Sequence, residues 1–217
     1  SFDVNKDFKP VSLLAKVPSL YLVNPEVPAK NLVEFIALAK KKPGQLNYGS
    51  AGNGSAGHLA MEYLKMSSGI FITHVPYRGT VPSITDLVGG QIAAAMNPSG
   101  DYLQYMKSGK VRVLATSGKK RSPYLPDVPT FTELGYPDVT SEEWFGFYAP
   151  AKTPAATLAN ANAAITAALK DKSVIDALGM VGLVAHGSTP QEMAADQKAE
   201  FERWGPLVKQ IGFTAES

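Results

Sequence analysis

A glycine-rich turn at residues 48–58 constrains the fold of this chain more than any other feature. It reads Tyr-Gly-Ser-Ala-Gly-Asn-Gly-Ser-Ala-Gly-His. The residues before it, 45–48, have the pattern of a brief strand, and apolar residues recur at helical spacing over 59–67. We therefore expect the turn to lie at the carboxyl end of a strand and to open a helix.

Such a turn favours a negatively charged guest. Glycine tolerates positive φ and lets a ligand approach the backbone closely. The first turn of a helix leaves N–H groups without partners and carries a partial positive charge. The turn therefore predicts binding of a carboxylate or another small anion.

Other interpretations of the turn compete with anion binding. Residues 52–57 match the G-x-G-x-x-G dinucleotide pattern, but the acidic residue expected about 20 positions later is absent, and the next strand ends near Arg78. A Walker loop is excluded because no Gly-Lys-Ser/Thr follows. A turn that needs small residues only for packing remains open.

Composition and charge narrow the class of protein. With 217 residues, 45% of them hydrophobic, the chain can bury a substantial core. The formal charge is only +2, and Lys40, Lys41 and Lys42 form a cationic helix end rather than a nucleic-acid patch. The absence of cysteine removes disulfides and thiolate chemistry. No apolar run approaches the length of a membrane span, and the first residues are not a signal peptide, so we expect any export signal to lie outside this sequence.

Strand and helix patterns alternate through the first two thirds of the chain. Strands are predicted at 11–14 and 19–23, with a break at Pro18, and at 71–77, 92–96 and 111–116; helices are predicted at 31–42, 59–67, 81–88 and 101–107. This alternation indicates right-handed βαβ units and a parallel sheet with helices on both faces.

The pattern changes after residue 120. A proline-rich stretch, 122–136, holds a short predicted helix at 130–134 and precedes an extended segment at 140–149. This segment carries Trp144, Phe145 and Phe147, which we interpret as hinge and core aromatics, the alternative being that they line an aromatic ligand. Helices follow at 154–169, 173–180 and 190–209, with one strand candidate at 183–186.

Most predicted strands lie between residues 20 and 140, and few lie in the rest of the chain, so the two parts are expected to form different lobes. Residues 20–140 form a complete α/β lobe, whereas 1–19 and 145–217 are parts of a second lobe whose sheet is mostly missing. Segments 11–23 and 140–149 would be the two crossovers of a hinge. The apolar face of the last helix would then lack a cover, so we expect the chain to be oligomeric or locally disordered there.

Several motifs, taken in order, carry a family resemblance. They lie at residues 2–14, at 46–58 with Asn-Tyr-Gly-Ser-x-Gly-x-Gly, at 74–79 (His-Val-Pro-Tyr-Arg-Gly), at 86–91 (Asp-Leu-Val-Gly-Gly-Gln), at 121–130 and at 144–146 (Trp-Phe-Gly). Together they closely resemble the solute receptors of tripartite tricarboxylate transporters, the Bug family, over essentially the whole chain.

The resemblance implies a periplasmic-binding-protein-like (type II) α/β fold of two lobes, one complete parallel-sheet lobe and one incomplete, because the N-terminal third of the family pattern is absent. It also implies a periplasmic receptor that captures a small carboxylate, such as a di- or tricarboxylate, an amino acid or an aromatic acid, for an inner-membrane permease. No cofactor, metal, nucleic acid or direct membrane insertion is expected.

The candidate ligand-binding residues fall in three loops that each follow a strand. His58, at the start of a helix, could bind the ligand or only cap and pack. The third loop departs from the family pattern at Ala93, where members commonly have an acid, and this predicts retained anion binding with altered selectivity. The resemblance and the turn together select Ser50, Gly52, Asn53, Gly54, Ser55 and His58 in the first loop, Tyr77, Arg78 and Gly79 in the second, and Asn97 and Ser99 in the third.

Two other function classes were considered. A hydrolase could use Ser50 or Ser55 with His58, but there is no Gly-x-Ser-x-Gly elbow and no acid placed to orient the histidine. The three histidines lack metal-ligand spacing. A ligand-sensing regulatory module would need an accompanying segment such as a helix-turn-helix, which the sequence does not indicate. We therefore expect a binding protein and not an enzyme.

Overall fold

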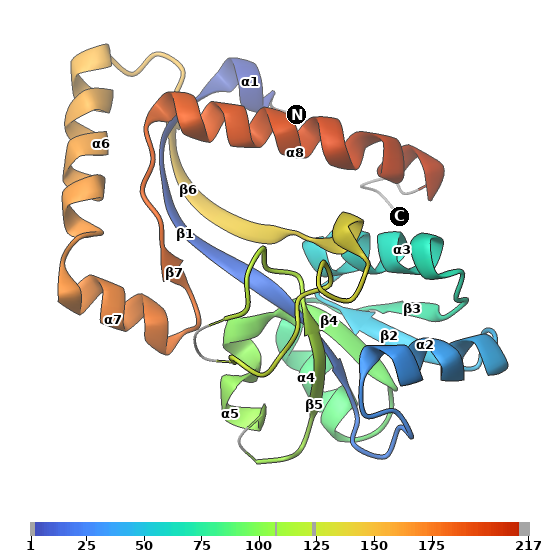
Figure 1. The fold of residues 1–217 in the computed structure, drawn as a ribbon. Helices are drawn as coiled ribbons and strands as arrows, with labels where there is room; N and C mark the ends of the chain where they lie inside the picture. Colours follow the sequence, from blue (N-terminus) through green and yellow to red (C-terminus); the bar gives the residue numbers. More distant parts are fainter. Residues whose placement is uncertain (1–2, 107, 123–124, 213–217) are drawn as a thin grey trace. The chain divides into compact units, whose positions relative to one another are not determined.

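The computed structural model describes residues 3–106, 108–122 and 125–212, and it divides into two compact units. The first comprises Ser1–Val17 and Trp144–Gly205, and the second Pro18–Glu143 and Pro206–Ser217. A single long strand, β1 (Phe8–Val23), contributes to both (Figure 1). That the first unit belongs to an incomplete lobe stays a prediction.

The second unit is built on a five-stranded sheet in the order β3-β2-β4-β1-β5. β2 (Asn47–Ser50) pairs in parallel with β3 (Thr73–Pro76) on one side and with β4 (Ala94–Pro98) on the other. β1 pairs antiparallel with β4 and with β5 (Arg112–Thr116). The prediction of an all-parallel sheet is therefore wrong at β1. Its last residues are buried on both faces, and a continuous apolar run does not reveal strand direction.

β1 also continues through Pro18, where a break was predicted. The antiparallel pairing with β4 begins at Ser19, and the pairing with β7 (Val184–Ala185) involves Ala15 and Lys16. Pro18 lies between these two ladders, where its missing N–H breaks no described ladder bond, so the strand tolerates it.

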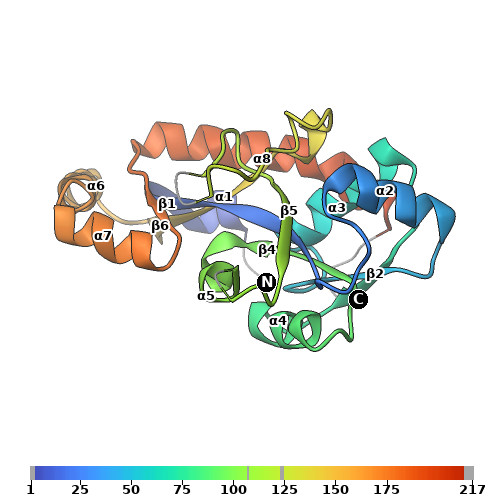
Figure 2. The ribbon, with the colours of Figure 1, turned by 60° about the horizontal axis from the view of Figure 1, so that its bottom comes forward.

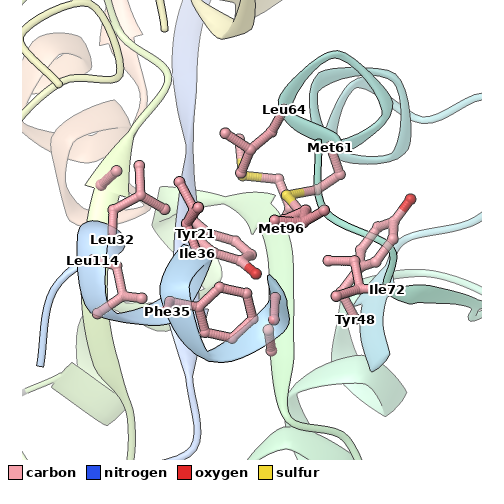
Figure 3. Close-up of a cluster of buried hydrophobic side chains, with 14 of the residues drawn as sticks. Tyr21, Leu32, Phe35, Ile36, Tyr48, Met61, Leu64, Ile72, Met96 and Leu114 are labelled. Carbon is pink, nitrogen blue, oxygen red and sulfur yellow. The ribbon is translucent and has the colours of Figure 1, made fainter. Parts of the chain in front are cut away.

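Helices cover both faces of this sheet, as predicted. α2 (Leu32–Lys41) and α3 (Ala56–Ser68) pack on one face, and α4 (Thr80–Val88) and the 3-10 turn η1 (Ser99–Tyr102) pack on the other (Figures 1 and 2). The alternation of side chains along β1 sends Tyr21 into the first core and Leu20 into the second. Figure 3 shows the first core, where Tyr21 and Phe35 meet edge to face at 5.3 Å.

Two shorter elements differ from the predicted ones. The segment predicted as a helix at 130–134 is a turn, because its capping pair, Thr130 and Glu133, is followed too soon by Gly135 with φ 87° and by the 3-10 turn η2 (Pro137–Val139). The helix predicted at 101–107 divides into η1 and α5 (Leu103–Met106), and residue 107 lies outside the described residues.

In the first unit, helices surround the N-terminal part of β1 and the strands that pair with it. These strands are β6 (Glu142–Pro150), which begins two residues before this unit, and β7. The helices are α1 (Val4–Asp7), α6 (Ala155–Ala168), α7 (Lys172–Met180) and α8 (Pro190–Gln210), of which the part up to Gly205 belongs to this unit. α1 was not predicted. Its four residues are too few to show helical periodicity, and it begins at the Asp3 cap.

An apolar groove of about 1000 Å³ opens in the first unit beside α8. Phe8 and Tyr148 line it, together with Phe201, whose side chain is 79% exposed. None of the predicted ligand-binding residues lies in this groove. Among the helices within the described ranges, none combines the length and the apolar character that crossing a membrane requires.

Candidate functional site

Three loops meet at one edge of the sheet in the second unit, where the parallel strands β2, β3 and β4 end. Because β2 lies between the other two strands, its loop adjoins both neighbours. The Tyr77 N–H donates to Ser50 O at 3.1 Å and the Gly79 N–H to Ala51 O at 3.0 Å, which joins the loops after β2 and β3. Carboxyl ends of parallel strands are where open α/β sheets bind ligands.

The loop after β2 has the backbone conformation that its glycines predict. Gly52 has φ 142° and Gly54 has φ 74°, both outside the range that other residues readily adopt. The Ser55 hydroxyl caps α3 by accepting from the His58 N–H at 3.3 Å. Ser55 is partly exposed and Asn53 is exposed.

Two backbone N–H groups remain available at the start of α3. The N–H groups of Ala56 and Gly57 are the first two of the helix, and neither meets an acceptor within the part of the chain that the structure describes. Gly57 is also where α3 lies closest to β4, since a Cβ built on it would fall 2.0 Å from Met96 O. The helix start is thus held against the sheet with donors unused, an arrangement suited to an anion.

The Ser50 side chain faces inward. Ser50 is fully buried, and its hydroxyl donates to Gly52 O at 3.0 Å while accepting from the Gly52 N–H at 3.2 Å. The same oxygen lies 2.7 Å from Nε2 of His74. In this conformation Ser50 shapes the loop from within and does not reach a ligand directly.

His58 and His74, 16 positions apart in sequence, stack on one another beneath the loop. Their ring centroids are 4.1 Å apart with an angle of 9° between the planes. His58 Nδ1 accepts from the Gly54 N–H at 3.0 Å, and His58 Nε2 lies 3.9 Å from a Glu62 carboxylate oxygen. His58 thus contacts the loop from a buried position, and its choice between ligand binding and capping or packing stays a prediction.

Burial determines the protonation of both rings. Desolvation lowers the pKa of His58, opposed by Glu62 and assisted by Lys65. Burial, followed by the proximity of His58 and Lys65, lowers the pKa of His74 to about 3. Both rings are thus neutral near pH 7.

The involvement of His74 was not predicted from the sequence. His74 was considered only as part of a motif and as a possible metal ligand. The parallel register places it directly opposite Tyr48 on β2, whose ring it also stacks on at 4.8 Å. Side chains alternate along a strand, so Tyr48 and Ser50 lie on the same face of β2, the face under α3. His74 can be assigned to that face only when the register of β3 against β2 is known, and the sequence alone does not give this register.

The loop after β3 contributes an exposed cation. Arg78 is exposed, and no carboxylate of a described residue lies within ion-pair distance of its guanidinium. Gly79, with φ 99°, precedes α4 without a side-chain cap. Tyr77 donates from its hydroxyl to Asp86 at 2.7 Å, and burial together with this bond raises its pKa to about 12. Tyr77 therefore secures α4, and Arg78 is the group that can pair with an anion.

The end of β4 is held by buried polar groups. Asn97 is fully buried and donates from Nδ2 to Ser83 Oγ at 3.1 Å and to the Tyr102 hydroxyl at 2.8 Å. Ser99, the first residue of η1, is 6% exposed. In this conformation the Asn97 amide N–H₂ bonds within the protein, and neither Asn97 nor Ser99 is exposed.

No group of three or more histidine, aspartate or glutamate side chains that could hold a metal ion occurs among the described residues. The sheet brings the first two of the three candidate loops side by side, and together they present backbone N–H donors and one guanidinium.

The sequence matches the tripartite tricarboxylate transporter family receptor over residues 1–213.

Individual relatives agree with this match. Protein BugT of Bordetella pertussis is 33% identical over 211 residues, which are 97% of this chain and 65% of BugT. An R. palustris protein solved with adipate is 33% identical with a TM-score of 0.90, covering 97% of this chain and 71% of that one. MatC from Rhodopseudomonas palustris, solved with bound malate, is 31% identical with a TM-score of 0.85, covering 96% and 72%.

These comparisons confirm the resemblance and the fold class drawn from the sequence motifs. The chain spans about 65% of the length of BugT. It spans a similar share of other curated relatives whose alignment covers nearly all of this chain. The match over residues 1–213 covers nearly the whole sequence. This chain belongs to the tripartite tricarboxylate transporter receptor family.

Proposed function

We propose that this protein is a solute receptor that binds a small carboxylate and supplies it to a tripartite tricarboxylate-type permease. Two solved relatives carry adipate and malate, which are dicarboxylates. The same proposal assigns the protein to the periplasm and makes the permease subunits its partners. Ligand identity would be set by the residues around the loops after β2 and β3.

The observation that carries the proposal is that two backbone donors and one guanidinium, none of them bonded to an acceptor among the described residues, lie on neighbouring loops. The N–H groups of Ala56 and Gly57 lie at the positive end of α3. Arg78 is on the next loop, which two backbone hydrogen bonds join to the first. A carboxylate can satisfy both kinds of donor at once, since charge-assisted hydrogen bonds to it are strong.

The contacts made by the serines and His58 argue against the hydrolase alternative. The hydroxyl of Ser55 accepts from a backbone N–H of α3, and that of Ser50 is buried. His58 uses Nδ1 to accept from the Gly54 N–H, so this ring nitrogen is already engaged with the loop backbone. The relatives are receptors by family, which favours binding over catalysis and over a regulatory module.

Binding is tested by titrating malate and adipate into the purified protein and measuring heat and melting temperature. Dimethyl adipate, with the same carbon chain and no charge, is the matched control ligand. We expect at least one dicarboxylate to bind and the ester not to bind; a ligand at 100 times its dissociation constant stabilises the folded state by about 2.7 kcal/mol. Equal responses to the acid and the ester, or no response to a wider panel of carboxylates, would overturn the proposal.

The Arg78→Gln variant locates the site within the protein. Glutamine keeps a polar side chain with an N–H donor but is shorter and carries no charge. Affinity should fall at least tenfold, with an unchanged melting temperature in the absence of ligand, because the exposed guanidinium makes no ion pair with a described residue. Unchanged affinity would place the carboxylate elsewhere.

A further inference from the structure

A stack of three rings, with Tyr48 and His58 buried and His74 half-buried, lies under the loop after β2, on the face of the sheet that α3 covers. His74 is sandwiched between Tyr48 at 4.8 Å and His58 at 4.1 Å. Each imidazole also contacts the loop: His58 through the Gly54 N–H, and His74 through the Ser50 hydroxyl. His58 is thus bonded directly to Gly54, and His74 is linked to Gly52 through the Ser50 hydroxyl. Gly52 and Gly54 are the two glycines of this loop with positive φ.

We propose that His58 and His74 act as a pair of positioning residues that hold this loop in its anion-binding conformation, with His74 acting through Ser50. The inference rests on the proposed function, because it concerns how the carboxylate loop is kept ready to bind. Neither imidazole touches the ligand in this account. The pair fixes the two glycines whose conformation aims the backbone donors.

The hydrogen-bond count at Ser50 assigns a direction to the bond from His74. The hydroxyl has one proton, and it already donates that proton to Gly52 O and accepts from the Gly52 N–H. A donor at His74 Nε2–H fills the remaining lone pair of Ser50 and lets all three contacts of the hydroxyl form at once. His74 is thus a neutral Nε2–H tautomer when the Ser50–Gly52 contacts are complete.

The hydrogen-bond partners of the His58 ring nitrogens also indicate the neutral Nε2–H tautomer. A backbone N–H is always a donor, so Nδ1 of His58 must carry a lone pair to accept from Gly54. Its proton then lies on Nε2, on the side of the Glu62 carboxylate. If His58 carried a proton on Nδ1, this N–H would point at the Gly54 N–H, and the hydrogen bond between them would be lost.

The surroundings keep this arrangement neutral and rigid. The charged and titratable groups facing the pair are Glu62 and Lys65 on α3 and Tyr48 on β2. Lys65 bonds to both carboxylate oxygens of Glu62, at 2.7 and 2.9 Å, and the Tyr48 hydroxyl donates to Glu62 at 2.9 Å. Glu62 is therefore already paired, and burial lowers the pKa of both histidines.

A double-mutant cycle on malate and adipate affinity tests whether His74 acts through Ser50. His74→Phe keeps a ring in the stack and removes the hydrogen bond to Ser50, whereas Ser50→Ala removes that bond together with the two contacts of the hydroxyl to Gly52. His74→Phe should weaken binding about tenfold, the change expected for one ordinary hydrogen bond, Ser50→Ala should weaken it at least as much, and the double variant should bind no more weakly than Ser50→Ala alone. Losses that multiply to about a hundredfold, or His74→Phe binding like the wild type, would overturn the inference.

Histidine nitrogen NMR of the unaltered protein provides a second test that needs neither ligand nor variants. We expect His58 and His74 to show the neutral Nε2–H pattern at pH 7, with the exposed His186 as an internal reference. A proton on Nδ1 of either His58 or His74 would overturn the inference even if every variant failed to fold. Failure of the wild type to bind any carboxylate would overturn the proposed function instead, and the tautomers would still decide whether the loop is braced in this way.

Discussion

Lowering the pH from 7 to 5 should destabilise this protein through His74. Burial holds the pKa of His74 at about 3 in the folded chain, against 6.5 for the free side chain. Between these values the unfolded chain takes up a proton that the folded chain does not. Stability is therefore complete above pH 6.5 and falls as the pH drops towards the folded-state pKa.

The size of the effect follows from the pKa difference. Each pH unit in this interval corresponds to about 1.36 kcal/mol, so the interval of about 1.5 units from 6.5 to 5 corresponds to about 2 kcal/mol. Water reaches part of the half-buried ring, which reduces the expected loss to about 1 to 2 kcal/mol. Burial of His58 shifts its pKa downward too and adds to the loss in the same direction.

Urea unfolding at the two pH values, for the wild type and for His74→Phe, isolates this contribution from that of the carboxylates. Phenylalanine takes up no proton, so the variant should lose about 1 to 2 kcal/mol less stability than the wild type between pH 7 and 5. Equal losses in the two proteins would show that His74 titrates normally in the folded state, and the account of its burial would then be wrong.

Three further substitutions have defined outcomes. Gly57→Ala should lower stability by about 1 to 3 kcal/mol by chemical denaturation, because its Cβ would overlap Met96 O; a tolerated Gly57→Ala would contradict the close approach. Gly54→Val should weaken malate or adipate binding at least tenfold by calorimetry while circular dichroism stays native, because a β-branched residue resists φ 74°; full affinity would favour a turn that only packs. Tyr77→Phe should cost about 1 kcal/mol of stability through the lost bond to Asp86 and leave carboxylate affinity within twofold; a large loss of affinity would assign Tyr77 to the ligand.

Much of the fold was predictable because the signals for it are local. The helix predicted at 31–42 is observed as Leu32–Lys41 with Asn31 as its cap, and the helix at 81–88 as Thr80–Val88. The glycine turn also has its predicted place, between β2 and α3. Apolar periodicity, caps and glycines act over a few residues, so a single sequence contains them.

Strand direction and side-chain partnership were not predictable in the same way. The antiparallel direction of β1 depends on which strands it inserts between, and nothing in its own apolar run encodes that choice. The contact between His58 and His74 depends on the register of β3 against β2 and on where α3 crosses the sheet. Exposure is equally non-local: Ser50 and Asn97 were selected as ligand contacts, and both are fully buried behind their loops.

The buried polar groups behind these loops are informative about the site. Burying a polar group costs free energy unless it is hydrogen-bonded, and an apolar residue of similar size would fill the same space at lower cost. Ser50 and Asn97 nonetheless stand fully buried at the carboxyl ends of β2 and β4, where Asn97 Oδ1 has no partner among the described residues. Fixed hydrogen bonds at this edge restrict the loops to one conformation, and a loop already in that conformation loses little entropy when an anion binds. The buried polar groups at this edge lower the stability of the fold but hold the backbone donors in a fixed arrangement. Such a combination is expected of a binding site rather than of a core that only packs.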